Sequence, residues 1–414
     1  MNNLDTKTLL KINPITFTLG GCALWLFLFA IAPLEIKVKL SIEGVFFLAF
    51  NLLFLVLGLK LFNSMAISNQ ENVIKPLLYR VTIILGLLCV LLKIYDKIFI
   101  RGGNFLEGFF ENRSNFAENG SNAVAIIHSI LTGFTFIPLF LYSYFGKRSK
   151  TLLLLSYLLF FSVALDIFLI GSRSGTILCF LIYIYYLYIF KKIKFTRINL
   201  VKYLAILLIG GIWMGVVFIN RSKEFAGDGV VFYTLSTAGF TETIGPDESL
   251  INSLLNTDSE ILQTIGLSYT TLINYYVHGI IEFLYIYDKF NSNHTLGSYT
   301  FYIYYKFINI IFGLGVPNFE NIALVNPRPA VYTSFYGPIF FDFGWFSLIF
   351  SFLLGCGISY VHKKAVTHDF SYTIIYSYFI NLIFFIPVFN FIEGAAGLYV
   401  VTSFLLFKLL TKII

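Results

Sequence analysis

Charged residues are scarce in this chain of 414 residues, since Asp, Glu, Lys and Arg together make up only 12% of it. A soluble domain of ordinary composition carries about twice that fraction. Apolar residues account for 57% of the chain, and its mean hydropathy is +0.80. This shortage of charge excludes an ordinary soluble domain.

Motifs for nucleotide and metal chemistry are also missing. The sequence contains no Walker loop, no GxGxxG opening a helix, no HExxH and no CxxC. Cys22, Cys89, Cys179 and Cys356 lie inside apolar stretches without paired spacing, which is typical of small core residues rather than disulfides or metal ligands. We therefore expect no cofactor and no metal. An ATP-driven pump is disfavoured, as is a nucleotide-sugar enzyme with a cytoplasmic domain.

Long apolar runs are what the sequence has instead. Each is long enough to cross the hydrocarbon layer of roughly 30 Å as a helix, and helices satisfy their backbone polar groups internally. The pattern predicts an all-α polytopic membrane protein with about ten spans, or twelve if a Tyr-rich region adds two. The spans are expected at about 15–33, 41–62, 77–94, 123–145, 151–170, 175–190, 200–219, 336–360, 371–389 and 394–410.

These spans divide the chain into three parts. A seven-helix membrane part is expected at 1–219 and a three-helix membrane part at 336–414. Between them, 220–335 is more polar and is interpreted as an external region with interfacial or re-entrant helices.

The distribution of basic residues predicts the orientation. With the N-terminus in the cytoplasm, 17 of the 29 Lys and Arg residues fall on the inner side, most densely in 191–202. Such a bias in short loops is the reliable orienting signal. We expect a multi-pass protein of the cytoplasmic (inner) membrane with both termini in the cytoplasm. The net charge of +7 is then explained by inner loops facing anionic lipid, with no nucleic-acid partner.

Tyrosine is concentrated in one stretch of the external region. Residues 266–306 contain nine of the 27 tyrosines, together with His278, Glu282, Asp288 and His294. One interpretation is an aromatic belt at the membrane surface or a pair of additional spans. The other is a floor on which sugar rings stack, and the two are compatible.

Three arginines are placed to meet a phosphate-bearing substrate at the outer surface. Arg173 lies in Gly171-Ser172-Arg173-Ser174-Gly175 ahead of a span, Arg221 follows the next span, and Arg328 lies between Pro327 and Pro329. The planar guanidinium fork matches two phosphate oxygens and stays charged. For each arginine alone, an interfacial residue with no ligand is the alternative interpretation.

The arginine-bearing turn, Arg221, the Tyr-rich external region and the stretch 332–344 (YTSFYGPIFFDFG) resemble the Wzy-type O-antigen and oligosaccharide repeat-unit polymerases. The likeness covers most of the chain in topology, through short motifs. It implies a fold like that of the C-type membrane glycosyltransferases.

The resemblance implies transfer of a growing glycan from undecaprenyl diphosphate to a lipid-linked repeat unit at the outer face. The donor and acceptor lipids would be its partners, together with membrane lipids, and a chain-length regulator is a further candidate partner. Arg173, Arg221 and Arg328 would neutralise the diphosphate without a metal. The base that deprotonates the sugar hydroxyl would come from the outer side, where the candidates are His278, His294, Glu282 and Asp342. His278 is the first of these, and Glu282, one helical turn further on, would orient it. Expected sugar contacts are Tyr275, Tyr276, Tyr332 and Tyr336.

Two other functions remain open. An O-antigen ligase shares the topology but typically has a His-rich motif before the span that follows the large loop, and 326–337 contains no histidine. A lipid-linked oligosaccharide flippase would move the same substrate without chemistry. Flippases of this pathway usually have more spans in a repeated pattern, and no internal repeat is visible here.

Overall fold

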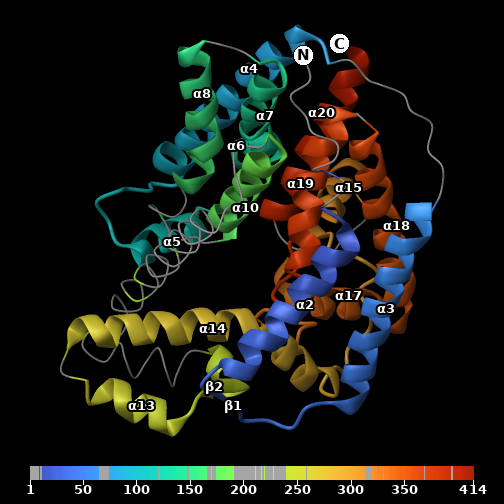
Figure 1. The fold of residues 1–414 in the computed structure, drawn as a ribbon. Helices are drawn as coiled ribbons and strands as arrows, with labels where there is room; N and C mark the ends of the chain where they lie inside the picture. Colours follow the sequence, from blue (N-terminus) through green and yellow to red (C-terminus); the bar gives the residue numbers. More distant parts are fainter. Residues whose placement is uncertain are drawn as a thin grey trace, which may run out of the picture.

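The computed structural model is almost entirely helical and is shown in Figure 1. The residues that it describes are 9, 12–64, 74–119, 122–146, 149–165, 169, 174–190, 210, 216, 219, 227, 239–257, 259–313, 319–329, 331–367, 369–392 and 395–414. Arg173, Arg221 and nearly all of the expected span 200–219 lie outside these residues.

Helices before the polar region are α2 (Pro14–Ile31), α3 (Ile42–Ser64), α4 (Pro76–Ile94), α5 (Phe109–Glu118), α6 (Ala123–Leu131), α7 (Ile137–Tyr144), α8 (Lys150–Phe161) and α10 (Ser174–Ile189). Those that follow are α13 (Glu248–Leu255), α14 (Glu260–Tyr287), α15 (Tyr302–Phe312), α16 (Phe319–Ala323), α17 (Tyr336–Phe343), α18 (Ser347–Val366), α19 (Phe370–Phe384) and α20 (Ala395–Ile413). Their starts follow local rules. At α2, for example, Asn13 caps the amide of Ile15 and Pro14 occupies the first turn.

Five helical segments among the described residues are long and apolar enough to cross a membrane: Pro14–Ile31, Ile42–Leu61, Pro76–Ile100, Ala123–Tyr144 and Tyr336–Val366. They coincide with the first four expected spans and the eighth. Shorter apolar helices, Lys150–Ala164, Ile177–Ile189 and Phe370–Phe384, lie within three of the other expected spans. The protein is therefore a helical membrane protein, and the count of ten spans stays a prediction.

The helices form an up-and-down bundle, and the C-terminal helix α20 ends at the top of the view in Figure 1. At the opposite end, α13 and α14 lie across the bundle rather than along it. There β1 (Leu34–Ile36), directly after α2, pairs antiparallel with β2 (Ile244–Pro246). The expectation of an all-α fold missed this small sheet, because two three-residue strands far apart in sequence leave no periodic pattern.

Helices α3 and α18 form a close packing contact in the bundle. A Cβ on Gly355 would lie 2.3 Å from the Leu55 carbonyl oxygen, and one on Gly58 would lie 2.1 Å from that of Phe352. Small residues of this kind let two membrane helices approach closely. One turn away, both Ser347 and Ser351 donate hydrogen bonds to the Asn51 side-chain oxygen.

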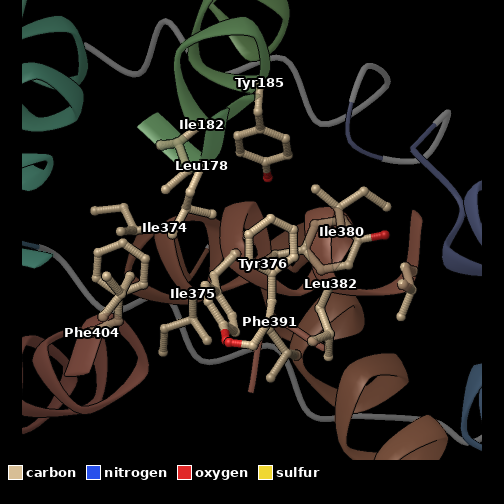
Figure 2. Packing of buried hydrophobic residues seen from close by; sticks show 14 of the residues in the cluster. Leu178, Ile182, Tyr185, Ile374, Ile375, Tyr376, Ile380, Leu382, Phe391 and Phe404 are labelled. Carbon is tan, nitrogen blue, oxygen red and sulfur yellow. The ribbon is translucent and has the colours of Figure 1, made fainter. Parts of the chain in front are cut away.

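A second packed interface joins α10 to α19 across the bundle core. In Figure 2, Leu178, Ile182 and Tyr185 from α10 face Ile374 and its neighbours on α19. The Tyr185 hydroxyl donates to the Thr373 carbonyl, so this buried phenol has a partner inside the apolar layer. Long-range apolar packing of this kind fixes which helices are neighbours.

The eighth expected span is broken rather than continuous. Helix α17 ends at Phe343, a short 3₁₀ turn covers Gly344–Phe346, and α18 begins at Ser347. Gly344 has φ +52° and ψ −135°, a conformation that side chains strongly disfavour. A Cβ there would also lie 2.4 Å from His294 Nε2. The glycine therefore permits both the break and the close approach of the histidine.

Replacing Gly355 by Ala is expected to destabilise the protein by about 1–3 kcal/mol, because the new methyl group has no room against α3. Gly357 lies on the same helix, and a methyl group added there would have nothing within 4 Å of it, so Gly357→Ala is the matched control. It should leave stability equal or slightly higher, since Ala favours helix over Gly. Thermal unfolding in one detergent would compare the two, and equal melting temperatures would contradict the close contact.

Candidate functional site

Helix α14 carries four of the candidate residues, Tyr275, Tyr276, His278 and Glu282, and is fixed firmly to the bundle. Ser259 caps its first turn. The indole N–H of Trp25, on α2, donates to the Val277 carbonyl. A Cβ on Gly279 would lie 2.5 Å from the Val388 carbonyl oxygen and 2.9 Å from the Ser334 amide nitrogen. The absence of a side chain at Gly279 thus lets α14 lie directly against two loops of the C-terminal part.

Glu282 is the centre of a buried polar network. Its carboxylate is fully buried, accepts a hydrogen bond from the Thr243 hydroxyl at 2.8 Å, and lies 3.3 Å from Arg328 Nε. Arg328 Nη2 is 3.0 Å from the carboxylate of Glu242, which is largely exposed. One guanidinium therefore joins a buried carboxylate to an exposed one. Burial raises the pKa of Glu282, and the Thr243 and Arg328 contacts oppose that rise.

The loop that carries Arg328 is held in shape by its own side chains. The Asn326 side-chain oxygen accepts the Arg328 amide, and its nitrogen donates to the Val331 carbonyl. Tyr285, on α14, places its ring 5.7 Å from the guanidinium carbon. Arg328 is thus ordered by a carboxylate pair, an aromatic face and a rigid loop, which are contacts that suit Arg better than Lys.

His278 lies one helical turn before Glu282, also buried. Its Nδ1 is 3.1 Å from the Asn274 carbonyl oxygen. A carbonyl only accepts, so Nδ1 must carry the proton and the lone pair of the neutral ring is on Nε2. Burial lowers the pKa of His278 to about 4. The backbone hydrogen bonds oppose this lowering, and the positive charge of Arg328 adds to it. The imidazole is therefore neutral at pH 7.

The sequence predicted that Glu282 orients His278, but in the structure the two side chains have different partners. Glu282 is engaged by Thr243 and Arg328, and the Asn274 carbonyl holds the histidine ring. Asn274 itself is tied to β2, because its side-chain nitrogen donates to the Ile244 carbonyl. The i, i+4 spacing places the two side chains on one face of the helix, but the tertiary partners decide what each one binds.

Of the four tyrosines expected to bind sugar, two gather around His278. The Tyr332 ring lies 4.5 Å from the imidazole, edge to face, and Tyr275 lies 5.0 Å from Tyr332. Tyr276 instead packs against Phe385, and Tyr336 is buried in the main core cluster. Only Tyr275 and Tyr332 thus belong to the same cluster as the histidine.

Asp342 has a structural role. It is fully buried, and its carboxylate accepts hydrogen bonds from the amides of Gly297, Tyr299 and Thr300 and from the Thr295 hydroxyl. It therefore fastens the 295–300 loop to the end of α17. These four donors are the reason that the carboxylate can be fully buried at this point.

His294 lies in the same junction, with Nδ1 3.3 Å from the Phe341 carbonyl oxygen and its ring stacked 5.1 Å from Phe290. The Asp-Phe-Gly sequence is thus explained by the shape of a loop–helix junction.

Sequence reasoning did not identify Glu242 or Thr243, which complete the network around Arg328. Their segment has no periodic or motif signal, and it reaches α14 through the pairing of β1 with β2 and through the hydrogen bond from Asn274 to the Ile244 carbonyl.

A second polar cluster was also missed, at the π-helical turn Tyr95–Ile100. There the buried Asp96 binds Arg101, Asn122 and His128. An acidic residue within an apolar run was the available signal.

Among the described residues, no three His, Cys, Asp or Glu side chains gather closely enough to hold a metal ion. Comparison with family models, curated proteins and solved structures found no match for this chain. The site is thus described by its own geometry: a neutral buried histidine packed with two tyrosines, one helical turn from a glutamate whose arginine partner also pairs with a second carboxylate.

Asp342→Ala is expected to destabilise the protein strongly. Three backbone amides would lose their acceptor, and each buried donor left unpaired costs about 1–3 kcal/mol. Asp342→Asn keeps one acceptor oxygen and should be less damaging. The check is thermal unfolding in detergent, alongside Asp247→Ala at the N-cap of α13, where a loss of only about 1 kcal/mol is expected. A wild-type melting temperature for Asp342→Ala would contradict the structural role.

Proposed function

We propose that the protein is a membrane glycosyltransferase that polymerises lipid-linked glycan repeat units at the outer face of the cytoplasmic membrane. The observation that carries this proposal is that Arg328 pairs with Glu282 one helical turn from His278, which packs against Tyr332, on the helix α14 that lies across one end of the bundle in Figure 1. The resemblance of the arginine-bearing turn and of 332–344 to repeat-unit polymerases supports it independently.

In the proposed reaction the acceptor sugar hydroxyl gives its proton to His278 Nε2 while its oxygen attacks the anomeric carbon of the donor. The bond from that carbon to the diphosphate oxygen breaks, and the electron pair leaves with the diphosphate. Since the proton is lost as the new bond forms, a neutral base of modest strength is sufficient. Tyr275 and Tyr332 would contact the acceptor sugar and hold it next to the imidazole.

Arg328 would bind the diphosphate by exchanging one partner. Its contact to the exposed Glu242 is the replaceable one, because a surface ion pair contributes about 1 kcal/mol or less. The contact to the buried Glu282 would persist and hold the guanidinium plane during the exchange. Arg173 and Arg221 remain proposed further ligands of the diphosphate.

The first test is the glycan made by a strain whose own gene is replaced by variants. Arg328→Ala should reduce a ladder of chain lengths to a single repeat unit, with a rate loss of roughly 10²-fold or more. Arg328→Lys should rescue only partly, since the bidentate fork is lost. Arg80→Ala, an exposed arginine on α4, is the matched control and should keep the ladder.

The same gel analysis distinguishes a polymerase from a ligase and from a flippase. Long chains on the carrier lipid with none on the final acceptor would indicate a ligase instead. No repeat unit at the outer face would indicate a flippase. A normal ladder from Arg328→Ala, with the protein in the membrane, would contradict the arginine's role.

The rate should have an acidic limb with a midpoint near pH 4, where the pKa of His278 lies, instead of near 6.5. Above that pH the imidazole is neutral and able to accept a proton, and as the pH falls through it the base is lost. The measurement is initial rate against pH with purified enzyme and lipid-linked repeat units. His278→Gln should remove most of the rate, and Glu282→Gln should keep the histidine limb. A midpoint near 6.5 would contradict the buried, neutral state.

A further inference from the structure

The first turns of α14 expose a row of large apolar side chains. Ile261 is 74% exposed, Leu262 62%, Ile265 43% and Tyr269 47%. Residues 261, 265 and 269 are spaced by four, so they lie along one face of the helix, with Leu262 beside them. A row of this kind on a helix outside the spanning segments needs an apolar environment.

The opposite face of the same turns is occupied by α13. Gln263 donates a side-chain hydrogen bond to the Leu254 carbonyl, and Leu267 packs with Leu254. At 3.6 residues per turn, the mean direction of residues 263, 266 and 267 points roughly away from that of the exposed row. Helix α13 lies on the side of α14 that is farther from the spanning helices (Figure 1). The exposed row therefore faces the side on which the bundle and its membrane lie.

The level of α14 along the bundle is set by α2. Trp25, near the end of that candidate span, donates to the Val277 carbonyl of α14. On the same last turns of α2, Leu26 and Phe27 are each 60% exposed and Ile31 is 48% exposed, as expected of a surface that contacts lipid. The exposed apolar surface of the span continues past this contact by about six residues, roughly 9 Å, so α14 meets α2 within the depth of that surface.

We propose that the N-terminal half of α14 lies in the headgroup layer of the membrane, with Ile261, Leu262, Ile265 and Tyr269 inserted among the lipids of that leaflet. Helices with one apolar face occupy this depth, roughly 5–10 Å into the boundary between headgroups and acyl chains. Tyr269 suits it, because tyrosine has an apolar ring and a polar end. The occupant of the exposed row is therefore lipid, and α13 faces water.

This placement has a consequence for the site farther along the same helix. His278 and Glu282 follow the inserted half by about three turns, in one continuous helix. They are then held near the depth of lipid phosphate groups, where the diphosphate of a lipid-linked substrate would lie. The membrane contact itself does not depend on the proposed reaction and can be tested without it.

The test is fluorescence of a polarity-sensitive label in lipid nanodiscs. The label is attached to Ile265→Cys, or to Ser249→Cys on α13 as the control, with the four native cysteines replaced by Ala. At 265 we expect a blue-shifted emission that is quenched by brominated lipid and shielded from iodide in water. At 249 the pattern should be reversed. Equal iodide quenching at both sites would overturn the proposal.

A second measurement covers the case in which the cysteine-free chain fails to fold. A photoreactive amino acid at 265 in the natural chain should crosslink to lipid on illumination, and mass spectrometry of the product identifies the partner. Crosslinks to another segment of this chain, or a label at 265 that neither quencher reaches, would mean that protein covers the row and would overturn the proposal.

Discussion

The buried carboxylate of Glu282 is the constraint on which the arrangement of α14 and its neighbouring segments depends. A charged carboxylate removed from water costs several kcal/mol unless it is paired and hydrogen-bonded. Glu282 obtains its partners from two distant segments, Thr243 beside β2 and Arg328 in the loop before α17. Three stretches of chain that are far apart in sequence must therefore be positioned correctly at the same time. This requirement also keeps Arg328 ordered, and the same guanidinium pairs with the exposed carboxylate of Glu242.

Asp342 imposes a similar constraint on the other side of α14. Its four hydrogen bonds fasten the 295–300 loop to α17, and Gly344 lets the chain turn beneath His294. The two buried carboxylates have different roles. Asp342 is saturated by backbone and hydroxyl donors and shapes a junction, whereas Glu282 holds a guanidinium that reaches the surface.

Helix α14 connects these constraints to the membrane. It is anchored at its middle by Trp25 and packs closely through Gly279. These contacts, together with those of Asn274 and Glu282, fix the lateral position of its first half and the buried position of its second half. A lipid-linked substrate diffusing in the leaflet would meet the inserted half before it meets the arginine and the histidine, which is a physical reason for placing such a site on a helix that lies along the membrane surface.

Composition and apolar run length were enough to predict a helical membrane protein, because the cost of unpaired backbone groups in lipid allows few other solutions. Four expected spans at the N-terminal end and the eighth were located to within a few residues, apart from the break at Gly344. The sequence also selected Arg328, His278 and Glu282, since ionisable residues are conspicuous in so apolar a chain. Their partners were not predictable. Glu242, Thr243 and the Asn274 carbonyl reach the site only through strand pairing and helix packing over long sequence separations. For the same reason the loop amides that bind Asp342 were not predictable: the donors around a buried carboxylate come from the tertiary fold, and no local pattern records them.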